Sequence, residues 1–137
     1  MKLINALFAA TLLCLSIAGR ADEATTGPHG GQLKHSGKYH LELVVKDTAL
    51  TVYLTGDKDA KIAAKGATGN ATVLAGKVTS NVKLEPRGEN ALAGSGSFQP
   101  APGMKVVVSV TLPGQTPIQA RFTPLEAPKP SAKGSAK

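Results

Sequence analysis

The chain has 137 residues, with 16 Lys and Arg against 9 Asp and Glu, which gives a formal net charge of +7. This length predicts one domain, and a single cysteine excludes a disulfide framework within it. The basic residues are spread along the chain and are not interleaved with aromatic residues, which argues against nucleic-acid binding.

Residues 1–21 have the pattern of a secretory signal peptide. A positively charged start is followed by an apolar run to Ala18, and Gly19 and Ala21 fit the −3 and −1 positions of a cleavage site. A cut after Ala18 is the alternative. We therefore expect an exported, periplasmic protein whose mature chain of 116 residues carries 14 basic and 9 acidic residues. Cleavage also removes Cys14, which excludes thiol chemistry from the mature protein.

Residues 28–124 are predicted to form one all-β domain. Short runs of alternating apolar and polar residues are separated by Gly, Pro, Asn and Asp, which is typical of strands joined by turns. Such runs occupy residues 38–45, 50–55, 71–75, 82–84, 92–98, 106–112 and 118–122. We expect about eight antiparallel strands, arranged as an immunoglobulin-like β-sandwich.

The two ends of the mature chain are predicted to lack regular structure. Residues 22–27 are polar without a period and are expected to form a flexible segment. Residues 125–137 combine prolines, a glycine and three lysines, which predicts a disordered basic tail. Such a tail would make at most a peripheral contact with anionic headgroups at a membrane surface.

The three histidines, His29, His35 and His40, are close together in the sequence, and Glu42 follows. His40 and Glu42 are two apart in a predicted strand, so they project from the same face. A two-residue turn at Ser36-Gly37 would place His35 diagonally near His40 on that face. His29 lies on a flexible entry to this hairpin and can fold back over it. Imidazoles and a carboxylate are ligands of Zn²⁺ and Cu²⁺, so the pattern predicts a transition-metal site.

The same residues have a purely structural interpretation. His40 and Glu42 can be ordinary residues on the solvent-facing side of a strand, and His35 a residue beside a turn. Lys38 shares their predicted face, and its charge opposes a bound cation. The Gly30-Gly31 pair can mark only a bulge or a turn with positive φ.

Other candidate sites are weaker. The two carboxylates of residues 56–59 offer too few oxygen ligands for calcium, and this segment is predicted to be a turn. Residues 94–96 (Gly-Ser-Gly) lie within a strand pattern with no helix after it, which favours close packing or a bulge over a phosphate cradle. We do not expect an enzyme, because no serine has the context of a nucleophile elbow and all histidines lie in one region.

Residues 27–31 (GPHGG) and 39–43 (YHLEL) together resemble a segment of periplasmic adaptor subunits of heavy-metal efflux pumps and of small exported bacterial proteins. The later segments 94–98, 102–103 and 121–122 are similar to those small proteins as well. The chain has no long helical hairpin of the kind that such adaptors use, so it does not correspond to a complete adaptor.

What the resemblance implies is a metal-linked role in the bacterial envelope that involves His29, His40 and Glu42, whereas His35 lies outside the matched segment. We therefore expect a transition-metal-binding accessory protein, a carrier, buffer or sensor beside a metal efflux system, that holds Zn²⁺ or Cu²⁺. Binding should weaken below about pH 6, because imidazole ligates only when neutral. The alternative is a metal-free interaction module to which an envelope partner adds a strand.

Overall fold

The computed structural model describes residues 25–125. The predicted signal peptide (1–21) and all but the first residue of the predicted basic tail (125–137) lie outside the described residues. The strands are β1 Thr25–Thr26, β2 Gln32–Ser36, β3 Tyr39–Lys46, β4 Ala49–Thr55, β5 Thr68–Ala75, β6 Val78–Pro86, β7 Ala91–Ser95, β8 Lys105–Thr111 and β9 Ile118–Phe122, and the 3₁₀ segment η1 covers Asp57–Asp59. The all-β prediction is thus confirmed for this part of the chain. Residues 25–125 contain no helix that is long and apolar enough to cross a membrane.

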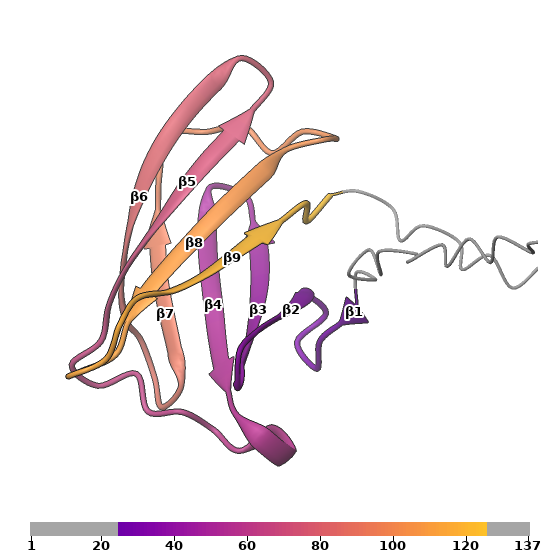
Figure 1. The fold of residues 1–137 in the computed structure, drawn as a ribbon. Coiled ribbons are helices and arrows are strands. Elements are labelled where there is room, and N and C mark those ends of the chain that lie inside the picture. Colours follow the sequence, from indigo (N-terminus) through magenta and orange to yellow (C-terminus); the bar gives the residue numbers. More distant parts are fainter. Residues whose placement is uncertain (1–24, 126–137) are drawn as a thin grey trace, which may run out of the picture.

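The nine strands of residues 25–125 belong to one antiparallel sheet in the order β1-β2-β3-β4-β7-β6-β5-β8-β9, and the sheet curls into a half-barrel (Figure 1). Strand β6 joins the two halves by changing its partner along its length. Its residues 78–84 pair with β5, whereas Glu85 and Pro86 pair with β7. Because this exchange links the strands in one continuous order, the immunoglobulin-like sandwich of two separate sheets is not confirmed.

Alternate residues of most strands face the inside of the curled sheet, where they form the core. In β4, for example, Leu50, Val52 and Leu54 are buried, while the residues between them are partly exposed. Two aromatic residues, Phe98 and Phe122, take part in the described core, which is otherwise built mainly from Val, Leu and Ala. The burial of these aliphatic side chains supplies the main stabilisation of the fold.

The hairpin of β2 and β3 turns one residue later than the sequence predicts. Ser36 pairs with Tyr39, so the two turn residues are Gly37 and Lys38 and not Ser36 and Gly37. Gly37 adopts φ +60°, which the first central position of a tight hairpin turn requires and which glycine accepts at little cost. As a consequence His35 lies directly opposite His40 and not diagonally from it.

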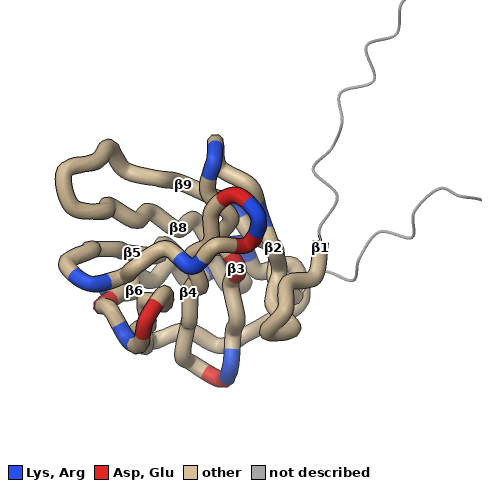
Figure 2. Tube along the Cα trace, turned by 90° about the horizontal axis from the view of Figure 1, so that it is seen from below, with Lys and Arg blue, Asp and Glu red and all other residues tan. Residues whose placement is uncertain are grey.

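Charged residues are spread over the described chain. Figure 2 shows Lys, Arg, Asp and Glu on several different loops and strands and not gathered on a single element. Two lysines have acidic partners: the Nζ of Lys61 lies 3.2 Å from Glu89, and that of Lys83 lies 3.1 Å from Glu85. All four of these side chains are mostly exposed, so the two pairs contribute little to stability.

Candidate functional site

Glu42 is a buried carboxylate on the outer face of the sheet. The side chains of Leu41 and Leu43 enter the core, so the intervening Glu42 points to the opposite side of β3. That side would be solvated in a bare sheet, yet Glu42 is only 2% exposed. The segment of residues 27–31, which we call the glycine loop, covers it.

The carboxylate of Glu42 accepts three hydrogen bonds from the glycine loop. The backbone N–H groups of His29 and Gly31 donate to its Oε1 at 2.7 and 3.0 Å, and the Nδ1 of the His29 ring lies 2.7 Å from its Oε2. Both carboxylate oxygens are thereby engaged, which offsets the cost of burying the charge. Glu42 is therefore the anchor of the glycine loop.

The glycines of this loop are required by space and by backbone geometry. A Cβ atom on Gly27 would lie 2.3 Å from the Cδ of Glu42, and one on Gly31 would lie 2.4 Å from the carbonyl oxygen of Leu43. Gly30 adopts φ +78°, a region that side chains with a Cβ disfavour. The spacing of glycines in residues 27–31 thus has a local explanation, since a Cβ atom would clash at Gly27 and Gly31 and would be disfavoured by the backbone at Gly30.

The ring of His29 is fixed from two directions. It stacks on Tyr53, with ring centroids 3.6 Å apart and planes within 2° of parallel. Tyr53 belongs to β4 and lies directly opposite Glu42, so the same pair of strands supplies the stacking surface and the carboxylate. Because an ionised carboxylate only accepts hydrogen bonds, Nδ1 of His29 is the donor in this contact. In the neutral form of the ring the lone pair therefore lies on Nε2. The His29 side chain is 44% exposed.

His35 and His40 form a second pair on the same outer face. Their ring centroids are 4.3 Å apart, and the rings meet edge to face at 64°. The Nδ1 of His40 also lies 3.9 Å from Oδ1 of Asp59, whose side chain is exposed in η1. Lys38 does not oppose this pair as the predicted register suggested, because it lies in the turn with its Nζ 5.3 Å from the centre of the Tyr39 ring.

The four predicted ligands therefore form two separate pairs. His29 contacts Glu42, and His35 contacts His40. Within residues 25–125 no three His, Cys, Asp or Glu side chains lie close enough to hold one metal ion together. Glu42 gives both oxygens to the glycine loop, and so its role in this structure is to orient His29.

Two residues of the site were missed from the sequence. Tyr53 was assigned only to a strand, and Asp59 only to a turn. The sequence does hold a signal for Tyr53. This residue lies on the outward face of the strand that forms a hairpin with β3, so its ring is expected beside Glu42 or two residues away along that strand. No local signal places Asp59 near His40, because this approach depends on the path of the chain after β4.

Comparisons with protein-family models, with curated proteins and with solved structures found no match to this chain.

Proposed function

We propose that this protein binds a transition-metal ion reversibly through His35 and His40. The observation that carries the proposal is the cross-strand pair of imidazoles, 4.3 Å apart between ring centroids on an outward-facing surface. Neutral imidazole is a good ligand for Zn²⁺ and Cu²⁺, with bonds of about 2.0–2.1 Å, and two rings this close can each turn one nitrogen toward the same ion. The nearby carboxylate of Asp59 makes the surroundings more favourable for a cation.

The other pair has a different part in this proposal. In metal sites of proteins a carboxylate commonly accepts the second ring N–H of a ligating histidine and so fixes the tautomer. Glu42 accepts a hydrogen bond from Nδ1 of His29 in the same way, so the other ring nitrogen, Nε2, is directed away from the carboxylate. This pair is separate from His35 and His40, so His29 and Glu42 are not ligands of the proposed site, and Glu42 is the residue that positions His29.

Two protein ligands with water completing the coordination suit an ion that is bound weakly and released readily. This supports a role as a carrier, buffer or sensor of Zn²⁺ or Cu²⁺. The predicted signal peptide supports a periplasmic location, and the resemblance of residues 27–31 and 39–43 supports a place beside a heavy-metal efflux system.

Calorimetric titration of residues 22–137 with Zn²⁺ and with Cu²⁺ at pH 7.4 tests the proposal. We expect one-to-one binding, tighter for Cu²⁺ as the Irving–Williams order requires, and about tenfold or more weaker in the His35→Ala/His40→Ala variant. Affinity should also fall between pH 7 and pH 5, because protonated imidazole does not ligate. The His29→Ala variant is the matched control, and its affinity should stay within about threefold of that of the unmodified protein.

Equal heats from the unmodified protein and the His35→Ala/His40→Ala variant would contradict the proposal. They would favour the second candidate, a metal-free interaction module of the envelope. One observation supports that candidate: β9 stands at the end of the strand order, and in the described chain its backbone pairs only with β8. An unpaired edge accepts an extended segment of a partner, and such binding would be unaffected by loss of the two histidines.

A further inference from the structure

The exposed large apolar side chains of the described chain gather at one end of the curled sheet. Within residues 25–125 they are Leu74, Val78 and Leu125, which are 41%, 56% and 42% exposed. Leu74 and Val78 flank the turn between β5 and β6, and Leu125 follows the end of β9. Figure 1 shows this turn, the loop before β8 and the end of β9 along the upper right border of the molecule.

The strand register brings these segments together. Leu74 of β5 lies directly opposite Lys105 of β8, and the next residue of β8, Val106, lies opposite Phe122 of β9. The residues on either side of Leu74 are buried, so Leu74 projects from the outer face of the sheet. Since directly paired residues share a face, Lys105 projects beside it. An aliphatic and a cationic side chain are therefore neighbours on this surface.

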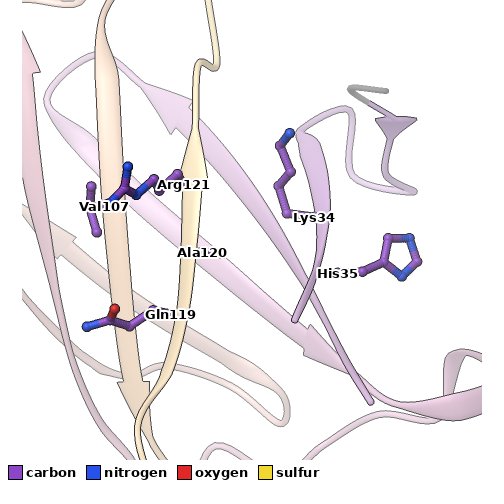
Figure 3. Close-up of a pocket in the computed structure, with 6 residues that line it drawn as sticks. All are labelled: Lys34, His35, Val107, Gln119, Ala120 and Arg121. Atoms are coloured by element: carbon purple, nitrogen blue, oxygen red, sulfur yellow. The ribbon is translucent and has the colours of Figure 1, made fainter. Parts of the chain in front are cut away.

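Three cationic side chains lie at this end of the sheet. Lys77 is in the β5–β6 turn, and Lys105 is the partner of Leu74. The side chain of Arg121 extends from β9 over β8 toward Val107, which is two residues from Lys105 on the same strand (Figure 3). All three cations are exposed, and within the part of the chain that the structure describes none of their side chains makes an ion pair or a hydrogen bond.

The charge of this surface is positive. The three segments that form it contain no aspartate or glutamate; they are residues 72–80, 97–107 and 118–125. The β3–β4 turn at the same end carries Lys46 and Asp47 and so adds no net charge. The chain continues from Leu125 into residues 126–137, whose three lysines and one glutamate add further positive charge.

We propose that this end of the sheet binds the surface of a membrane that contains anionic phospholipids. Cationic side chains are attracted to the negative potential of such a surface, and each lysine strengthens binding about fivefold. The exposed aliphatic side chains gain by entering the boundary between the headgroups and the acyl chains. The three cations stand on two strands and a turn and do not converge on one point, so they match a surface with many anionic groups better than a single small ligand.

Sedimentation of residues 22–137 with lipid vesicles tests the proposal. Vesicles of phosphatidylglycerol and phosphatidylcholine are compared with vesicles of phosphatidylcholine alone, in chelator-treated buffer, which keeps the result independent of the metal proposal. We expect binding to the anionic vesicles to be about tenfold or more tighter than to the neutral ones. This binding should weaken as salt is added, because salt screens the attraction between exposed charges.

Two double variants separate the charged from the apolar part of the surface. At physiological salt the Lys77→Gln/Lys105→Gln variant should bind the anionic vesicles about tenfold or more weakly than the unmodified protein. The Leu74→Ser/Val78→Ser variant should bind about fivefold more weakly, because it loses the apolar contact. All four side chains are exposed, so we expect both variants to fold.

The matched control is Lys58→Gln/Lys65→Gln. It removes two exposed lysines, one from η1 and one from the segment before β5, at the opposite end of the sheet (Figure 1). Its affinity should stay within about twofold of that of the unmodified protein. Equal weakening by this control and by Lys77→Gln/Lys105→Gln would overturn the proposal, because the attraction would then depend only on net charge.

Two further results would also overturn the proposal. One is binding to anionic vesicles that neither variant of this surface weakens, since the rest of the chain would then be responsible. The other is no binding to anionic vesicles. In that case a dimer in analytical ultracentrifugation that is lost in Leu74→Ser/Val78→Ser would show that a second copy of the chain covers this end of the sheet.

Discussion

Replacing Gly94 with alanine is expected to lower the free energy of unfolding by about 3 kcal/mol. A Cβ atom at this position of β7 would lie 2.0 Å from the carbonyl oxygen of Lys83 in β6. The obstacle is backbone, which cannot rotate away as the end of a side chain can. It also lies just before the point where β6 leaves β5 and joins β7, so relief of the clash must disturb the junction between the two halves of the sheet.

Urea unfolding of the Gly94→Ala variant measures this effect. The matched control is Ser95→Ala, which changes the next, exposed residue of β7 and should alter the free energy of unfolding by no more than about 0.5 kcal/mol. If the two variants unfold at the same urea concentration, the close approach of β6 to Gly94 is not a feature of the protein. Gly96, where a Cβ atom would lie 2.5 Å from Cγ2 of Val82, should tolerate alanine better, because that obstacle is a side chain.

Replacement of Glu42 is the second large effect. In Glu42→Ala the backbone N–H groups of His29 and Gly31 lose their acceptor, and the ring of His29 loses the group that orients it. We expect a loss of about 2–3 kcal/mol in the free energy of unfolding, together with faster hydrogen exchange at both amides.

Glu42→Gln separates the role of shape from that of charge. Its amide oxygen can replace Oε1 and accept both backbone hydrogen bonds, while its NH₂ group faces Nδ1 of His29 and must donate to it. The proton of the ring then moves to Nε2. We expect stability within about 1 kcal/mol of the unmodified protein and a change of His29 tautomer in the ¹⁵N spectrum of the imidazoles. A Glu42→Ala variant as stable as the unmodified protein, or an unchanged tautomer in Glu42→Gln, would show that Glu42 does not anchor the loop.

Much of the fold could be predicted because it depends on local patterns. The alternation of Leu50, Val52 and Leu54 with polar residues is enough to predict β4 and its buried side. The arrangement of the strands depends on distant parts of the chain. Nothing within residues 78–86 indicates that β6 exchanges one partner for another, and this exchange is what makes a single curled sheet where two sheets were expected.

The site shows the same division between local and distant information. The period of two residues in a strand correctly places His35, His40 and Glu42 on one face. The one-residue error in the turn leaves that face unchanged, because it shifts the partner of each residue by two positions along β3. The burial of Glu42 could not be predicted, since it requires the loop to fold back onto β3. In the sequence this contact is reflected only in the glycines at positions 27 and 31, where a Cβ atom would clash with Glu42 or with the backbone of β3.

The most direct test of the metal proposal is a ¹H–¹⁵N spectrum of the imidazole groups of residues 22–137, recorded at pH 7.4 before and after one equivalent of Zn²⁺. We expect the resonance of one ring nitrogen each of His35 and His40 to shift on binding, while that of Nδ1 of His29, which is hydrogen-bonded to Glu42, stays unchanged. Resonances of His35 and His40 that do not move when Zn²⁺ is added, or a shift confined to His29, would contradict it.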